Sequence, residues 1–77
     1  MLQRVRELDP VALTQALREH GLRPGDVGWV MMVHAAGAGY QVEFVTLAGE
    51  TVSVVTVPAA SVRPVRAREV AHAPAVA

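Results

Sequence analysis

The sequence predicts a single small all-β domain, in which five antiparallel strands close into a barrel. Short stretches rich in valine and threonine recur between glycine- and proline-containing turns, and β-branched residues favour the half-buried surface of a sheet. One stretch, residues 40–45, alternates strictly between apolar and polar residues, which is typical of a strand with one buried face. The connections are too short for crossover helices, so consecutive strands should pair antiparallel. Five strands in about 60 residues can form a small barrel. We expect these side chains to fill it: Val27, Val30, Val42, Phe44, Val54 and Val62.

The first element, within residues 8–22, has two interpretations. Asp9 can cap a helix that begins with proline at its first position and ends before Gly21, so local rules favour a helix over Pro10–His20. The competing interpretation is a strand over Val11–Thr14, followed by a long loop that ends at His20. The residues alone leave both interpretations open.

The next segment is a tight turn, Arg23–Asp26, followed by a strand over Val27–Val33. Pro24 presets the first central position of the turn, and Gly25 supplies the positive φ that a type II turn requires at the second. Gly28 lies inside the strand and predicts either a β-bulge or a close approach of another backbone.

A bulge at Gly28 would turn both Val27 and Val30 into the core. It would also place Trp29 and Met31 on the outer face of the strand. In strict alternation Trp29 would instead accompany Val27 inward, so the orientation of the tryptophan depends on this one position.

Three further strands and one helical turn complete the predicted domain. In the strand Tyr40–Val45 the aromatic residues and Val42 face the core. The strand Thr51–Val57 ends before a proline that cannot donate to a ladder, and Pro58–Ser61 forms a single helical turn. A short last strand, Val62–Val65, contains Pro64 and therefore belongs at an edge.

The predicted domain covers residues 1–65, and residues 66–77 form an alanine-rich tail. Five of these last twelve residues are alanine, so we expect a flexible or helical tail that adds little to the core.

The run of motifs from Leu8 to Val65 resembles a family of small bacterial proteins known only as a domain of unknown function. The similarity lies in these segments: Leu8-Asp9, Val11–Thr14, Gly21–Val30, Tyr40–Phe44 and Val55–Ala59. Within them, Gly25-Asp26-x-Gly-x-Val is also similar to the KOW-type barrels of ribosomal and transcription proteins. The resemblance implies an SH3-like barrel whose first element is a strand, and so favours the strand over Val11–Thr14. It supplies no activity, ligand or catalytic residue. Trp29 and Met31 stand where the family pattern leads us to expect small or polar residues.

No group of residues predicts catalysis, and we expect neither a cofactor nor a metal. His20, His34 and His72 are far apart and lack partners at metal-ligand spacing. Ser53 and Ser61 lie outside any nucleophile-elbow motif. With no cysteine in the chain, disulfides and thiolate sites are excluded. The sequence therefore predicts a protein that is not an enzyme.

The leading functional hypothesis is an interaction module, formed around Trp29, Met31 and Tyr40. Tryptophan and methionine are enriched in protein interfaces. A chain of 77 residues builds only a small core and usually needs a disulfide, a metal or a partner subunit for stability. We therefore expect a homodimer or larger assembly, with an unidentified protein as a further possible partner.

The alternative hypothesis is a KOW-like nucleic-acid-binding module that uses Arg23, Arg63, Arg66 and Arg68. The seven arginines are balanced by seven acidic residues, whereas phosphate binding usually requires a basic excess. The same balance argues against binding to anionic membranes. No apolar run approaches the length of a membrane span, and the N-terminus lacks the apolar core of a signal peptide, so we expect a cytoplasmic protein.

Overall fold

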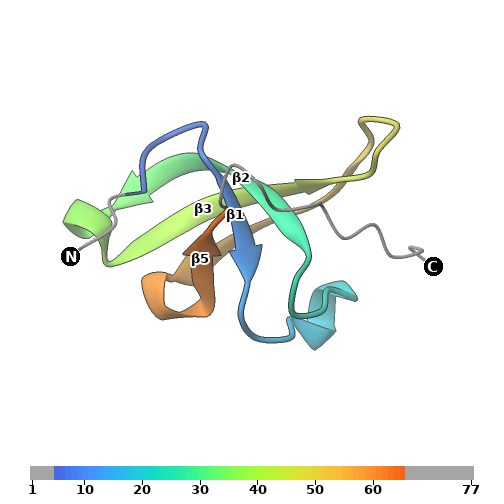
Figure 1. Cartoon of the computed structure of the whole chain (residues 1–77), viewed down its shortest axis with the longest axis horizontal. Helices are drawn as coiled ribbons and strands as arrows, with labels where there is room; N and C mark the ends of the chain where they lie inside the picture. Colours follow the sequence, from blue (N-terminus) through green and yellow to red (C-terminus); the bar gives the residue numbers. More distant parts are fainter. Residues whose placement is uncertain (1–4, 66–77) are drawn as a thin grey trace.

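A computed structural model describes residues 5–65 of the chain, and the structural statements below concern these residues. The predicted tail, residues 66–77, lies outside them. Figure 1 shows five strands connected by loops and three short 3-10 turns. The elements are β1 (Pro10–Leu13), η1 (Arg18–His20), β2 (Val27–His34), η2 (Ala35–Gly37), β3 (Gly39–Val45), β4 (Thr51–Pro58), η3 (Ala59–Ser61) and β5 (Val62–Pro64).

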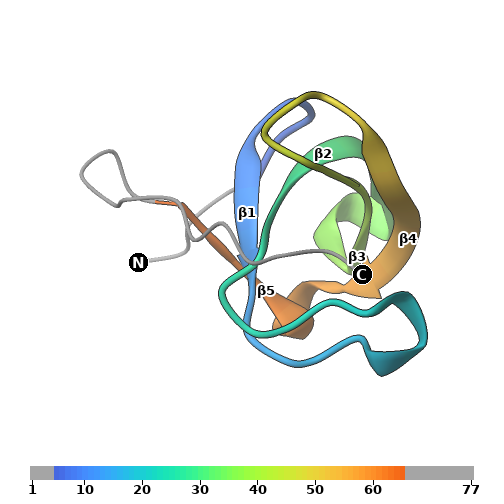
Figure 2. The same cartoon turned by 90° about the vertical axis from the view of Figure 1, so that its right-hand side faces the viewer.

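The five strands form one antiparallel sheet in the order β4-β3-β2-β1-β5. This confirms the predicted all-β class and the antiparallel pairing. The sheet is strongly curled, and η3 connects its two edge strands, β4 and β5 (Figure 2). Within the described residues these two edges do not pair with each other, so the sheet is open. The core lies on the concave face.

The first element is a strand, which resolves the alternative between helix and strand. β1 lies between β2 and β5 and pairs with both, and Val11, Ala12 and Leu13 are all buried. Pairing on two sides outweighs the local helix signals, because propensity is a weaker term than tertiary packing. The helix-ending glycine still has its expected role, since Gly21 adopts φ 68° and its N–H bonds to Arg18 after η1.

The predicted type II turn before β2 is present. Gly25 has φ 94°, and the N–H of Asp26 donates to the carbonyl of Arg23 at 3.1 Å. The Asp26 carboxylate in turn accepts the N–H of Arg23 at 2.9 Å and is buried. These two hydrogen bonds join the first and last residues of the turn and so stabilise it.

Gly28 marks a close backbone approach and not a bulge. It lies in regular register opposite Val11. A Cβ atom at this position would come 2.5 Å from Cγ1 of Val42 and 2.9 Å from the carbonyl oxygen of Glu43. Both distances are shorter than van der Waals contact, so only glycine allows β2 to pack here as it does.

The bulge in β2 lies further along, where the register shifts between Val30 and Met32. Gly28 and Val30 therefore face inward in ordinary alternation. The prediction that Val27 joins them was wrong, because it lies on the opposite side of the strand and is only half-buried.

Of the six residues predicted to fill the core, four are buried, and the prediction was wrong for Val54 as well as for Val27. Val54 is 50% exposed because it pairs with Glu43 on the outer face of the sheet. The Thr51–Val57 stretch is nearly all β-branched, so its sequence does not indicate which face is buried. The buried core consists of Val11, Leu13, Leu22, Val30, Tyr40, Val42, Phe44, Val57 and Val62.

In the described part of the chain, no helix is both long and apolar enough to cross a bilayer.

Candidate functional site

The outer face of the sheet carries a row of side chains that runs across three strands. Trp29 on β2 pairs with Glu43 on β3, and Glu43 pairs with Val54 on β4. Residues directly opposite each other in an antiparallel sheet project from the same face. Trp29 is 44% exposed, which resolves its orientation: the indole faces outward.

The bulge in β2 adds two methionines to this exposed apolar surface. Met31 is the extra residue of the bulge, and Met32 pairs with Gln41. They are 44% and 46% exposed, although regular alternation would have turned one of two neighbouring side chains inward. We refer to Trp29, Met31, Met32 and Val54 as the outer patch.

One charged residue lies within this row, and its carboxylate is held in place. Thr51 donates its hydroxyl to Oε2 of Glu43 at 2.6 Å. This bond ties the carboxylate to the start of β4. The four patch members are uncharged, but Glu43 lies between Trp29 and Val54, so a surface that covers the patch also covers this carboxylate, which keeps its hydrogen bond from Thr51.

The third residue of the predicted interface, Tyr40, lies elsewhere. It pairs with Val57 in the core and is only 7% exposed, as its inward position in the alternating strand predicted. The interface hypothesis therefore depends on Trp29 and Met31, to which the structure adds Met32 and Val54.

The two described arginines of the nucleic-acid hypothesis are exposed but lie on opposite sides of β1. The turn that begins at Arg23 contacts β1 through the N–H of Gly25, which donates to Leu13 at 2.8 Å. Arg63 pairs with Ala12 from the other side and donates to the carbonyl of the following proline at 3.3 Å. Arg66 and Arg68 lie outside the described residues, so the four-arginine site stays a prediction.

A contact that sequence reasoning missed joins η1 to β4. Nδ1 of His20 lies 2.9 Å from Oγ of Ser53, across 33 positions of the chain. The two residues belong to elements that only the fold brings together, and no spacing or motif could have indicated their contact. The sequence alone predicts both as isolated side chains.

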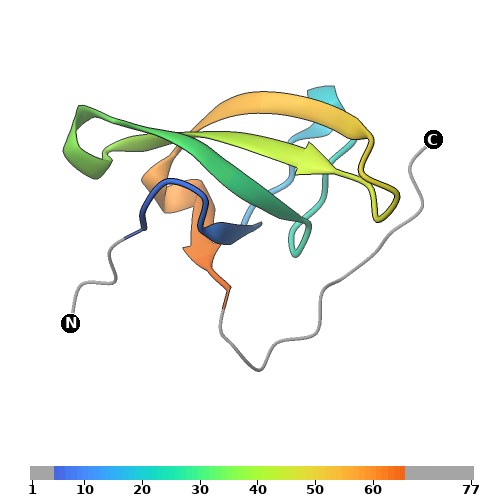
Figure 3. The same ribbon diagram turned by 90° about the horizontal axis from the view of Figure 1, so that it is seen from above.

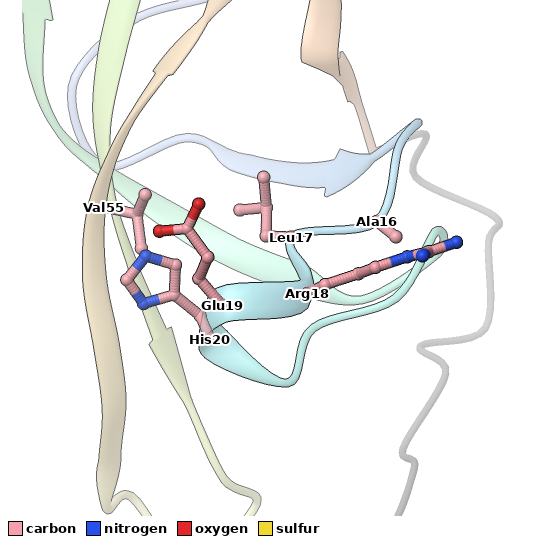
Figure 4. A pocket seen from close by; sticks show the side chains of 6 residues that line it. All are labelled: Ala16, Leu17, Arg18, Glu19, His20 and Val55. Atoms are coloured by element: carbon pink, nitrogen blue, oxygen red, sulfur yellow. The ribbon is translucent and has the colours of Figure 1, made fainter.

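An open hollow of about 390 Å³ lies beside this contact. Figure 4 shows η1 and the preceding loop on one side and β4 on the other. Its lining residues are Ala16, Leu17, Arg18, Glu19, His20 and Val55.

The His20–Ser53 pair has the atoms of a nucleophile and a base, but not their arrangement. An activated serine needs its base oriented by a third group, and the described residues give this imidazole one hydrogen bond only. Nor do they contain a cluster of three or more His, Cys, Asp or Glu side chains that could hold a metal ion. The contact joins η1 to β4, and Leu17, which precedes η1, packs against the core.

The fold and this surface define a small antiparallel β domain with an exposed apolar patch on the convex side of its sheet. Residues 7–64 match the family described as Domain of unknown function (DUF4926), so the chain belongs to that family. The matched range includes all five strands. Comparison with curated proteins and with solved structures gave no match.

Proposed function

We propose that the protein is a non-enzymatic interaction module that associates with a second copy of itself through the outer patch. The observation that supports this most strongly is the grouping of the four patch side chains on one face, each about half exposed. Single exposed apolar residues are common on protein surfaces, but several large ones on one face of a sheet are typical of a binding surface. The curled sheet, with a 3-10 turn before its last strand, supports the SH3-like barrel that the sequence resemblance implies.

The size of the patch agrees with a moderate interface. A tryptophan buries roughly 150–250 Å², so the 44% of Trp29 that remains exposed amounts to roughly 100 Å². At about 25 cal/mol per Å², covering it contributes about 2.5 kcal/mol per copy. Association costs at least about 4 kcal/mol in lost freedom of motion. Two tryptophans barely exceed that cost, so Met31, Met32 and Val54 must contribute as well.

A second copy is the partner best suited to this surface. The four patch members are uncharged, and the Glu43 carboxylate among them is hydrogen-bonded by Thr51. A twofold axis would place the patch against itself, which is the commonest arrangement in homo-oligomers. The chain has no formal net charge at neutral pH, so no long-range repulsion keeps two copies apart. The outer patch is also built on paired strands, so little backbone freedom remains to be lost on binding.

The experiment compares native mass, measured by light scattering over a range of concentrations, for the wild type and two variants. Trp29→Glu places a charge in the centre of the patch and should remove this contact, so that the assembly becomes smaller. The matched control is Leu47→Glu, because Leu47 is 88% exposed in the β3–β4 turn, outside the patch. It should assemble like the wild type. A wild-type protein that stays monomeric at every concentration, or a Trp29→Glu variant that assembles unchanged, would contradict the proposal.

A further inference from the structure

The two edges of the sheet differ in how well they are protected against pairing with another strand. β5 has three residues and contains Pro64, and short edge strands and prolines are common ways to block an edge. β4 has eight residues, and its first seven, Thr51–Val57, contain no charge, glycine or proline. Figure 3 shows β4 (yellow to orange) along one margin of the sheet, beside β3. The sequence of this edge strand therefore has none of the residues that usually block an edge.

The register shows which backbone groups of β4 point away from β3. One position beyond the ladder, the N–H of Ala59 donates to the carbonyl of Ala38 at 3.0 Å. Directly paired residues alternate between exchanging hydrogen bonds and exchanging none. Ala59 and Ala38 therefore form a hydrogen-bonded pair, and alternation along the register makes Val55 and Val42 another such pair. The N–H and C=O groups of Val54 and Thr56 then point away from β3.

Both outward-pointing residues are accessible. Val54 is 50% exposed and Thr56 is exposed as well. Within the described residues, the backbone hydrogen bonds that lie outside regular strand pairs and helices involve neither of them. η1 contacts β4 through the side chain of Ser53 and lines the hollow beside Val55, but it uses none of the backbone groups of Val54 and Thr56.

We propose that this edge binds β4 of a second copy, antiparallel, about a twofold axis at Val55. In this register Val54 faces Thr56 of the second copy, and Thr56 faces Val54 of the second copy. Each of the two pairs exchanges two backbone hydrogen bonds, which gives four in all. The two five-stranded sheets then become one continuous ten-stranded sheet.

The side chains of β4 fit this register. In the joined sheet, the outer face of one copy continues as the outer face of the other. Val54 of one copy and Thr56 of the other therefore meet on that face, and such β-branched cross-strand pairs are favourable. Glu50, the charge closest to the start of the strand, falls opposite Ala60 of the second copy. The symmetric register thus brings no like charges together, and it buries the unprotected edge of both chains.

The edge contact shares Val54 with the outer patch, but it uses the backbone groups of that residue and does not involve Trp29, Met31 or Met32. A chain with two different twofold contacts assembles into a four-chain particle when the geometry closes. Loss of either contact should then leave dimers, and loss of both should leave monomers. The two proposals can therefore fail separately.

The test introduces Thr56→Pro into the Trp29→Glu background, with Thr56→Val as the matched control. Proline removes an N–H that the β3 ladder does not use, and proline is tolerated on an edge whose N–H faces solvent. Trp29→Glu alone should form dimers. Adding Thr56→Pro should weaken them at least about tenfold, since the dimer loses two hydrogen bonds, whereas Thr56→Val should change the dissociation constant by less than about threefold.

Amide hydrogen exchange in the wild-type chain supplies a second measurement, which does not depend on the proline variant folding. Val54 and Thr56 should exchange slowly at concentrations where the chain assembles and rapidly when it is dilute, whereas Val55 should be protected in both. Equal exchange of the Val54 and Thr56 amides in both states would overturn the edge contact. So would a Trp29→Glu variant that is monomeric at every concentration, or a folded Thr56→Pro variant that dimerises normally. Assembly that is lost with Thr56→Pro but unaffected by Trp29→Glu would refute the outer-patch contact alone.

Discussion

Replacing Gly28 by alanine should destabilise the protein more than any other single methyl addition at a glycine. The added Cβ would lie 2.5 Å from Cγ1 of Val42, and 2.9 Å from both the carbonyl oxygen of Glu43 and Cδ1 of Phe44. Val42 is fully buried and Phe44 nearly so, and a backbone carbonyl in a central strand cannot retreat without breaking its ladder. Overpacking of a core costs about 1–3 kcal/mol, and we expect about 3 kcal/mol here because three neighbours must move together.

That loss is large for a domain of this size. Single cores in chains of this length rarely supply more than about 3–5 kcal/mol, and about 1 kcal/mol corresponds to roughly 4–8 °C in the melting temperature. The melting temperature of Gly28→Ala should therefore fall by more than about 12 °C. Urea unfolding followed by circular dichroism measures the free energy directly.

The control variant is Gly49→Ala. Gly49 has φ 88° and no atom within 4 Å of an added Cβ, so alanine there costs only about 1 kcal/mol of backbone strain. If Gly28→Ala lost no more stability than Gly49→Ala, the close approach of β2 and β3 described above would be wrong.

Two further predictions concern the turns, and both are tested by the same unfolding measurements. Asp26→Ala removes the buried carboxylate that accepts the Arg23 N–H and should cost about 1.5–3 kcal/mol. Asp26→Asn keeps an acceptor oxygen and should lose less stability. Equal losses in the two variants would contradict a stabilising role for this hydrogen bond. Ala36 adopts φ 56° in the β2–β3 loop, a region that alanine occupies at a cost and glycine does not. Ala36→Gly should therefore raise stability by about 0.5–1 kcal/mol, and a decrease would exclude strain at this loop.

Those parts of the fold that depend on local chemistry could be predicted from the sequence. The alternation of residues 40–45 identified the buried face of β3, and the Pro24-Gly25 pair identified the type II turn. Pro58–Ser61 was expected to form a helical turn, and the structure has η3 over Ala59–Ser61. In each case the residues concerned interact mainly with their own neighbours in the chain.

Features that depend on distant partners could not be predicted from local patterns. Local signals favoured a helix at Pro10–His20, but β1 is fixed by pairing with strands that follow much later. A run of β-branched residues does not alternate between apolar and polar side chains, so its sequence does not indicate the buried face. The face on which Val54 lies is set by its register with β3. The position of the bulge in β2 depends in the same way on how Met31 fits opposite β3.

The candidate site was predicted in part. The choice of Trp29 and Met31 rested on residue type and on a bulge expected at Gly28. Both are exposed in the structure, although Gly28 lies in regular register and the bulge is at Met31. Met32 was not anticipated, because its exposure results from the displaced bulge, and Val54 was placed in the core. The His20–Ser53 contact had no signal in the sequence at all.

The most direct test of the outer-patch contact uses the fluorescence of Trp29. It is the only tryptophan in the chain, so its emission reports on the outer patch alone. We predict that emission in dilute solution is that of a half-exposed indole, and that it shifts to shorter wavelength and resists quenching by acrylamide as the concentration rises. Emission and quenching that stay the same from dilute monomer to the most concentrated solution would contradict association through the outer patch.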